Sequence, residues 1–429
     1  MSDLLAARSQ MAVSLGFHIL FAVAGIAMPL LMVMAEVMWL RTGQRAYLDL
    51  ARRWAKGAAV LFAVGAVSGT VLSFELGLLW PRFMAYAGPI IGMPFSLEGL
   101  AFFLEAIFLG IYLYGWERVP PRAHCAAGAL VLLSGTASGL FVVTANAWMN
   151  TPAGFRVSGG RPVDIHPFQA MLNPSALHEA IHMTLASFLS VGMTVAAIHA
   201  WRLLKKPDSA FHRFGYGIAL SVGGAAALLQ PLSGDFSARS LARNQKVKLA
   251  ALEGQWETQK KAPLRVGGWI DEDAETTHYA LVIPSALSLL AYHDALAEVQ
   301  GLKAVPKRDR PPVGVVHAAF DVMVAAGLAL AAVALIGGGL AWRGGGIPTQ
   351  RWYLKLVAAA GPLGFIALEA GWTATEVGRQ PWIISGLMRV GDAVTPMPGL
   401  VYPFTVVTVL YLFLALAVLA ALKTLVNET

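Results

Sequence analysis

Long apolar runs separated by short polar segments extend along almost the whole chain. A transmembrane α-helix needs about 20 consecutive, mostly apolar residues. Runs of this length can be recognised at 11–40, 56–80, 95–116, 126–148, 180–204, 214–233, 314–342, 353–376 and 398–422. The pattern predicts an all-α polytopic membrane protein with about nine transmembrane helices. The first run is longer than the apolar part of a secretory signal and contains Ser14 and His18, so we expect it to remain in the mature protein.

The composition also indicates a membrane protein and excludes an ordinary soluble chain. Of the 429 residues, 57% are hydrophobic and only 13% are charged, whereas about 25% of residues in soluble domains are charged. The formal net charge of +7 is spread over short loops and forms no basic run, so we expect no nucleic-acid partner. The single cysteine, Cys125, excludes both a disulfide framework and a thiolate metal cluster.

Basic residues concentrate in the loops that follow every second apolar run. Short cytoplasmic loops of membrane proteins are enriched in Lys and Arg. The loops after the first, third, fifth and seventh runs contain Arg41, Arg45, Arg52, Arg53, Lys56, Arg118, Arg122, Arg202, Lys205, Lys206, Arg213, Arg343, Arg351 and Lys355. We therefore expect these loops to face the cytoplasm, with the N-terminus outside and the C-terminus inside.

Two predicted outward segments are longer than ordinary connections. The segment 150–179 is rich in Gly and Pro and is expected to form an ordered surface loop. The segment 234–313 combines an amphipathic stretch, an acidic patch and an apolar stretch, at Ala242–Trp256, Asp271–Glu275 and Ala280–Tyr292. The chain is thus predicted to consist of helices one to six, an extracytoplasmic loop, and helices seven to nine, at 1–233, 234–313 and 314–429.

Ionisable side chains interrupt several apolar runs. A charged side chain at the bilayer centre costs about 2.5–3.5 kcal/mol on insertion scales, so each needs a partner or a function. Residues seven apart share one helix face to within about 20°, which stacks Glu98 on Glu105 and Glu369 on Glu376. Such carboxylates carry protons in secondary transporters, which is one possible function. Alternatively, Glu376 simply forms an ion pair with Arg379, three residues further on.

Histidine and methionine residues in the same runs match the ligands of a haem iron. His18 lies in the first run, His182 in the fifth and Met323 in the seventh. A His and a Met together give a six-coordinate electron-transfer haem. Each residue also has a purely structural interpretation, because a membrane His often bonds a neighbouring helix and Met often fills apolar space. His178, one turn before His182, is an alternative ligand that spacing does not exclude.

Several sequence blocks occur in the order found in one known family. Besides His18, they are Glu98-Gly-Leu-Ala-Phe-Phe-Leu-Glu105, Asn146-Ala-Trp-Met149, Gly234-Asp235, Gln245-Lys-Val-Lys-Leu-Ala-Ala-Leu-Glu253-Gly-Gln-Trp256, and Gly371 to Trp382, which ends in Gly-Arg-Gln-Pro-Trp. These blocks are spread over nearly the whole chain. The sequence resembles subunit I of cytochrome bd-type quinol oxidases, and specifically the members with a short quinol loop.

The resemblance implies three haem cofactors, namely one low-spin haem b, one high-spin haem b and one haem d. The low-spin haem b would lie between His182 and Met323. His18 and Glu376 would be axial ligands of the two high-spin haems, with Glu98 close to one iron. Which high-spin haem takes which ligand stays open.

The resemblance also implies a terminal respiratory oxidase of the bacterial cytoplasmic membrane. Quinol would be oxidised at the outer face, at a loop site that contains Gln245, Lys248 and Glu253. O₂ would be reduced to water with protons drawn from the inside, so that charge separation generates proton motive force without a pump. The implied partners are quinol, O₂ and a second large membrane subunit, with room for a small single-helix subunit.

Five residues are implied to serve oxygen reduction and its proton supply, namely Glu98, Glu105, Trp372, Glu376 and Arg379. Glu98 and Glu105 lie about 10 Å apart along one helix face, a spacing that suits proton transfer through part of the membrane. We expect Glu98 to be closer to a haem and Glu105 to be the reversible proton carrier.

Two positions depart from the pattern of the family. Asp321 lies two residues before Met323, where the family often has a basic residue that can balance a haem propionate. The sequence therefore leaves open the charge partner of the low-spin haem. Ala106 replaces a hydroxyl residue that often follows Glu105, which removes one potential group from a proton path.

Overall fold

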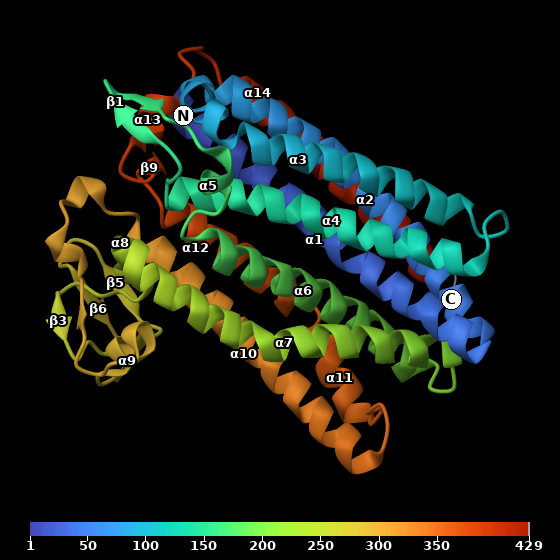
Figure 1. The fold of residues 1–429 in the computed structure, drawn as a ribbon. Coiled ribbons are helices and arrows are strands. Elements are labelled where there is room, and N and C mark those ends of the chain that lie inside the picture. Colours follow the sequence, from blue (N-terminus) through green and yellow to red (C-terminus); the bar gives the residue numbers. More distant parts are fainter. Residues whose placement is uncertain (428–429) are drawn as a thin grey trace.

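Nine candidate membrane spans form one bundle in the computed structural model, which describes residues 1–427 (Figure 1). Their helices are α1 (Asp3–Thr42), α2 (Arg45–Leu79), α3 (Pro81–Tyr114), α4 (Pro121–Asn150), α6 (Ala176–Lys205), α7 (Ala210–Asn244), α10 (Val313–Gly344), α11 (Arg351–Ala360), α12 (Leu363–Val377) and α14 (Val401–Asn427). Within these residues the predicted all-α membrane architecture is confirmed. The last two residues of the predicted segment 314–429 lie outside the described part of the chain.

Short elements occupy the connections between the spans. The helices are α5 (Pro167–Met171), α8 (Lys246–Leu252), α9 (Ala286–Tyr292), α13 (Val390–Ala393) and the 3₁₀ turns η1 (Leu302–Ala304) and η2 (Lys307–Asp309). The strands form antiparallel pairs: β1 (Arg156–Ser158) with β2 (Arg161–Val163), β3 (Gln259–Lys260) with β8 (Glu298–Val299), β4 (Leu264–Val266) with β7 (Leu281–Ile283), β5 (Trp269–Asp271) with β6 (Thr276–His278), and β9 (Trp382–Ile384) with β10 (Met388–Arg389).

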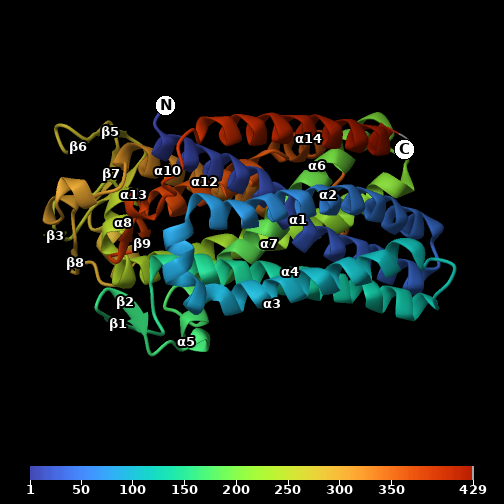
Figure 2. The ribbon, with the colours of Figure 1, turned by 90° about the horizontal axis from the view of Figure 1, so that it is seen from above.

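The strands and the N-terminus gather at one end of the bundle, which we call the loop end, and the C-terminus lies toward the opposite end (Figures 1 and 2). The odd number of spans places the two termini on opposite sides.

The long loop is built from nested strand pairs. β5 and β6 form the innermost hairpin, β4 and β7 pair outside it, and β3 and β8 pair outside both. The predicted boundary between residues 233 and 234 falls inside a helix, because α7 continues to Asn244. The apolar stretch Ala280–Tyr292 divides into β7 and α9, and the Tyr292 hydroxyl donates to the carbonyl of Ala242 at 3.0 Å. The loop is thereby attached to the projecting end of α7.

α1 lies at the centre of the bundle, whereas α2 and α14 lie at its surface. In the most apolar window of α1, 56% of residues are buried inside the protein, compared with 11% in α2 and in α14. The exposed side chains of α14 include Val406, Phe413 and Leu416. In a membrane such a surface faces lipid or another subunit, because apolar side chains cost nothing there.

The eighth span is interrupted between α11 and α12, at Gly361 and Pro362. Proline has no N–H to donate, so a break of this kind leaves carbonyl groups without helical partners. Side chains of α6 bond two carbonyls at the break: Thr194 Oγ1 donates to Gly361 at 2.9 Å, and Ser190 Oγ donates to Gly364 at 2.9 Å. A Cβ at Gly364 would lie 2.6 Å from Ser190 Cα, so this close approach requires glycine.

Candidate functional site

An ion pair with a buried guanidinium and a half-buried carboxylate lies at the loop end of α12. Glu376, in the last turn of α12, accepts a hydrogen bond from Arg379 Nη2 through Oε2 at 2.5 Å. Its other oxygen, Oε1, accepts a hydrogen bond from Asn146 Nδ2 of α4 at 2.5 Å. The side chain of Arg379 is only 4% exposed. The ion pair expected as the simpler interpretation of the sequence is therefore present, but α4 supplies a third member.

The predicted quinol residue Lys248 extends this group toward the loop. Lys248, on α8, is buried and donates from Nζ to Asn150 Oδ1 at 2.5 Å. Asn150 Nδ2 donates to Glu179 Oε1 at 3.4 Å and lies 3.5 Å from Asn146 Oδ1. A connected set of polar side chains therefore runs from the long loop to Glu376, and it joins α4, α6, α8 and α12.

Burial makes the charge of Lys248 dependent on its neighbours. Removal of its ammonium group from water lowers the pKa, while the carboxylate of Glu179 opposes this effect and the cation of Arg379 adds to it. Glu376 also acts to keep the lysine protonated. The stem of Lys248 packs on Gly378, where a Cβ would lie 3.1 Å from its Cγ.

Glu253, five residues after Lys248, faces different groups. It is only 6% exposed, and burial raises its pKa to about 8, with the carboxylate of Asp321 adding to the shift and Arg265 opposing it. Asp321 lies 3.4 Å from His317 Nε2, one turn earlier on α10. Lys248 and Glu253 therefore contact the bundle at two separate places. The basic group beside Asp321 is His317.

A serine hydroxyl on a neighbouring helix contacts each of the two predicted histidine ligands. His18 Nδ1 lies 3.0 Å from Ser68 Oγ of α2. His182 Nδ1 lies 2.9 Å from Ser233 Oγ of α7. A hydrogen-bond partner on one ring nitrogen fixes the orientation of the ring and so the direction in which the second nitrogen points. This is the usual arrangement around metal-ligating histidines.

The two neighbouring histidines of α6 differ in what faces their second ring nitrogen. His182 Nε2 lies 3.1 Å from Gln230 Nε2. His178 Nδ1 lies 3.2 Å from Ser237 Oγ, and its buried Nε2 has no hydrogen-bond partner among the described residues. Both rings are held by α7, so the choice of His182 as ligand remains a prediction.

The two predicted carboxylates of α3 point toward α4. Ser138 Oγ donates to Glu98 Oε1 at 3.4 Å. Glu105 is 5% exposed, and a Cβ at Gly135 of α4 would lie 3.0 Å from its carboxyl carbon. Gly25 of α1 leaves similar room, since a Cβ there would lie 3.4 Å from Glu105 Oε1. Glu105 thus lies in a gap that glycines open between α1, α3 and α4.

The remaining predicted residues occupy three different surroundings. Met323, on α10, faces α12, where a Cβ at Gly371 would lie 2.9 Å from its Sδ. Trp372 packs against the apolar cluster around α1 and α2. Gln245 Nε2 donates to Ser175 Oγ at 3.0 Å, at the start of α6.

Sequence reasoning did not assign a role to five residues that contact the predicted site or influence its charges. They are Asn146, Asn150, Glu179, Arg265 and His317. Asn146 belongs to one of the sequence blocks quoted above, but its side-chain amide is uncharged and therefore did not indicate a functional role. Glu179 and His317 lie near the ends of spans, where polar residues are common. The only available signal for His317 was its spacing of four residues from Asp321.

The geometry suits a cofactor that carries carboxylate groups. The guanidinium of Arg379 is buried, yet its Nε and Nη1 have no hydrogen-bond partner among residues 1–427. Such nitrogen atoms need a hydrogen-bond acceptor, and the propionates of an iron porphyrin are acceptors that also carry a negative charge. The predicted ligands His18, His182, Met323 and Glu376 come from α1, α6, α10 and α12. The donor set is therefore of the kind that holds haem.

The comparison with known families decides the class. The family described as cytochrome bd terminal oxidase subunit I matches residues 6–429. The chain belongs to this family. As a cytochrome bd terminal oxidase subunit I, it is a multi-pass membrane protein of a quinol:O₂ oxidoreductase. No finding supports the alternative of a secondary transporter.

Individual relatives extend over nearly the whole of this cytochrome bd subunit. A provisionally named cytochrome bd menaquinol oxidase subunit I of Bacillus subtilis (strain 168) is 37% identical, over 98% of this chain and 96% of its own length. The cytochrome bd-II ubiquinol oxidase subunit 1 of Escherichia coli (strain K12) is 31% identical, over 90% of this chain and 88% of its own. A solved bd oxidase from Geobacillus thermodenitrificans matches with a TM-score of 0.93 and 37% identity, over 100% of this chain and 99% of that one.

The raised pKa of Glu253 makes stability depend on pH in a defined direction. The unfolded side chain ionises near pH 4.5, whereas the folded one ionises near pH 8. Between these values the folded state binds more protons, so the contribution of Glu253 to stability falls as pH rises. We expect the Glu253→Gln variant to lose less stability between pH 5 and pH 8 than the parent, as measured by thermal unfolding in detergent.

The matched control is Glu257→Gln in the same loop, whose side chain is 62% exposed. This variant should follow the parent across the pH range. Parallel curves for the parent and the Glu253 variant would show that Glu253 is already ionised in the folded protein.

Proposed function

We propose that this chain carries the haems of a bacterial respiratory oxidase and oxidises quinol at its loop end. The observation that supports this most directly is the polar connection from Lys248 through Asn150 to the Glu376 and Arg379 pair. It joins the loop implied in quinol oxidation to the end of α12 implied in haem binding. We take the loop end to be the outer face of the cytoplasmic membrane, in keeping with the basic residues of the opposite loops.

The cofactor set we propose is two haem b groups and one haem d. His182 and Met323 would hold the low-spin haem b, and His18 and Glu376 the two high-spin haems, with Glu98 nearby. Bound haem would supply the iron that binds O₂ and the redox centres that pass electrons to it. Arg379 would neutralise a propionate with the nitrogen atoms that Glu376 leaves free. Trp372 would cover this site from the side of the apolar cluster.

On the loop side, two buried residues and the half-buried Gln245 would shape the quinol site. Gln245 anchors the start of α8 to Ser175, and Lys248 is fastened to Asn150. Glu253 is buried beside Arg265. Because these side chains are held from different directions, we expect them to position the loop against the bundle. The relatives include oxidases named for ubiquinol and for menaquinol, so we propose a quinol without choosing between these two types.

Protons for oxygen reduction would come from the opposite side of the membrane. Glu105 lies between α1, α3 and α4, and Glu98 lies on the same face of α3, toward the loop end. We propose that Glu105 passes protons to Glu98 during turnover. Since quinol would release its protons outside and O₂ would take up protons from the inside, charge would be separated without a pump.

The exposed apolar surface fits a complex of several subunits. Phe74 and Leu78 of α2 and Leu100 and Phe103 of α3 are each more than half exposed. We propose that a second large membrane subunit covers part of this surface, and that a small single-helix subunit can join the complex.

The proposed function is tested by the spectrum and turnover of the purified complex. We expect a reduced-minus-oxidised difference spectrum with the bands of haem b and of the chlorin-type haem d, and quinol-dependent O₂ uptake. A complex without the haem d band would contradict the cofactor set, and quinol-independent O₂ uptake would contradict the substrate.

The choice between the two histidines of α6 can be tested by exchanging each for alanine. His182→Ala should abolish the low-spin haem spectrum, because one strong axial ligand is lost, while the high-spin bands remain. His178→Ala is the matched control and should keep all three haems. The opposite result would make His178 the ligand.

The two carboxylates of α3 should separate in their effects. Glu105→Gln should slow proton uptake at least about tenfold, because a proton carrier typically contributes 10²–10⁴-fold, and should leave the haem spectra nearly unchanged. Glu98→Gln should alter the high-spin spectrum as well as turnover. Flow-flash measurements of proton uptake with spectra of both variants check this. Full activity of Glu105→Gln would assign Glu105 to helix packing.

A further inference from the structure

A cavity of about 380 Å³ lies at the end of the bundle opposite the loop end. Two segments that are distant in sequence line it, namely the first turns of α2 and the turn between α6 and α7. α2 contributes Asp49, Arg52, Arg53 and Lys56, and the turn contributes Ser209 and His212. Three cations against one carboxylate give this lining a net positive charge, so the ligand that it favours is an anion.

Arg52 is held on an aromatic ring and still lacks an acceptor for one of its N–H groups. Its guanidinium carbon lies 5.2 Å from the ring centroid of Trp116, in the turn between α3 and α4, which is a cation–π contact. Its Nε is buried and has no hydrogen-bond partner among residues 1–427. A buried N–H without an acceptor is costly. The position of Arg52 therefore favours a ligand whose oxygen atoms accept hydrogen bonds.

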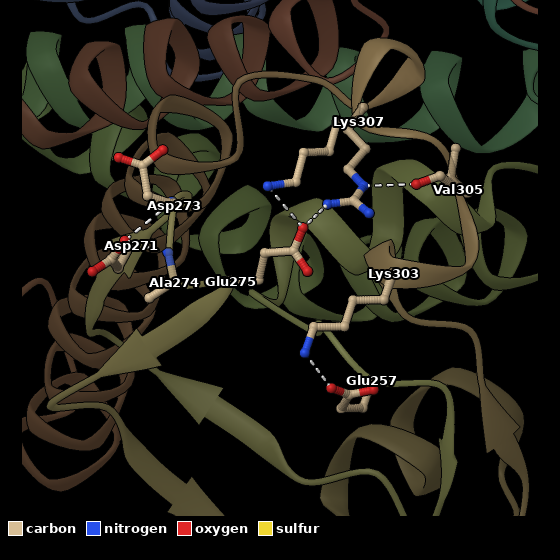
Figure 3. A network of polar contacts seen from close by, with 9 residues as sticks. Glu257, Asp271, Asp273, Ala274, Glu275, Lys303, Val305 and Lys307 are labelled. Carbon is tan, nitrogen blue, oxygen red and sulfur yellow. Dashed lines mark hydrogen bonds and ion pairs between the residues drawn. The ribbon is translucent and has the colours of Figure 1, made fainter.

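Lys56 is exposed and forms no ion pair with any residue that the structure describes. The lysines of the long loop differ in this respect (Figure 3). Lys307 Nζ lies 3.3 Å from Glu275 Oε1, and Lys303 Nζ lies 2.5 Å from Glu257 Oε1. The charges of the loop lysines are thus balanced within the protein, whereas the charge of Lys56 is available to a ligand.

Two arginines beside the cavity bind the last turn of α14. Arg53 Nη1 donates to the carbonyl of Leu425 at 2.8 Å, and Arg202 donates to the carbonyl of Val426. Arg202 also acts electrostatically on His212, which lines the cavity. These contacts join α2, α6 and α14 at this end of the bundle. An anion in the cavity would add a link between α2 and the turn that follows α6.

The cavity lies at the level where a membrane span begins. Arg52 is one helical turn before the apolar run 56–80. At the same end of α6, Trp201 is 55% exposed, and Lys205 Nζ lies 4.8 Å from the centroid of its ring. Exposed tryptophans and basic residues mark the boundary between hydrocarbon and water. Basic pockets between transmembrane helices on the cytoplasmic side bind the head groups of anionic lipids.

We propose that this cavity binds the phosphate group of an anionic phospholipid, with Arg52 and Lys56 as its principal contacts. The volume suits a glycerol phosphate head group, because small-molecule sites measure about 300–1,000 Å³, and the acyl chains would lie outside along the spans. The N-terminus of α7, capped by Ser209, adds partial positive charge on the other side of the cavity. The site is separate from the haem and quinol chemistry, and a bound phosphate would fasten α2 to the turn between α6 and α7.

The test measures lipid binding to the purified, delipidated complex by native mass spectrometry. Phosphatidylglycerol is the anionic probe, and phosphatidylcholine, which has no net charge, is the reference lipid. The parent should bind phosphatidylglycerol in preference to phosphatidylcholine. The double variant Arg52→Gln with Lys56→Gln should bind phosphatidylglycerol about thirtyfold more weakly, because two basic residues near an anionic lipid together contribute about this factor. Its affinity for phosphatidylcholine should not change.

The matched control is Arg118→Gln with Arg122→Gln, which removes two exposed cations around the turn between α3 and α4 at the same end. This control should change the affinity less than about threefold, because salt screens exposed charges. Lys56→Gln alone keeps the contact of Arg52 with Trp116 and should weaken binding about fivefold. The single variant keeps the test valid if the double variant does not fold.

Two results would overturn the proposal. The first is equal affinity for phosphatidylglycerol in the Arg52 and Lys56 variants and in the control. The second is equally tight binding of soluble glycerol 3-phosphate to the parent, since the cavity would then take a free phosphate rather than a lipid.

Discussion

The burial of the Arg379 guanidinium beside Glu376, at the end of α12, is the constraint on which the rest of the site depends. A guanidinium and a carboxylate are costly to remove from water unless their hydrogen-bonding positions are filled, and the described residues fill both oxygens of Glu376 but only one nitrogen of Arg379. The second carboxylate oxygen of Glu376 accepts a hydrogen bond from Asn146, so α4 must lie beside α12 at this height. Asn146 and Asn150 are one turn apart, and Asn150 holds Lys248. The start of the long loop is therefore bound to the same face of α4 that completes the ion pair.

The sequence was sufficient to predict the nine spans, because each apolar run is long enough to span a bilayer and few charges interrupt them. It did not predict the break at Gly361 and Pro362 inside the eighth run. At that break Thr194 and Ser190 donate to carbonyls across a helix contact, and this partner helix lies far away in sequence. The continuation of α7 to Asn244 was also missed, since residues 234–244 are polar and their helix is stabilised by the loop that packs on it.

For the site, the residues that carry the chemistry were easier to predict than the residues that surround them. His18, Glu98, Glu105 and Glu376 were recognisable because ionisable groups are costly in an apolar run. The burial of Lys248 could not be recognised from the sequence, because a lysine in a polar loop normally lies in solvent. Its surroundings depend on Asn150, a residue almost a hundred positions earlier. Pairings between neutral amides and distant charges leave no pattern in a single sequence, and only the packing of four helices reveals them.

The continuation of α7 to Asn244 makes this helix a direct link between the bundle and the long loop. Ser233, which contacts the ring of His182, and Ala242, which accepts from Tyr292 of α9, lie on one uninterrupted helix, about 14 Å apart along its axis. Because a continuous helix is stiff over this length, α7 fixes the separation between the folded loop and the ring of His182. The loop is thereby held in register with a side chain inside the bundle, although the two are far apart in sequence.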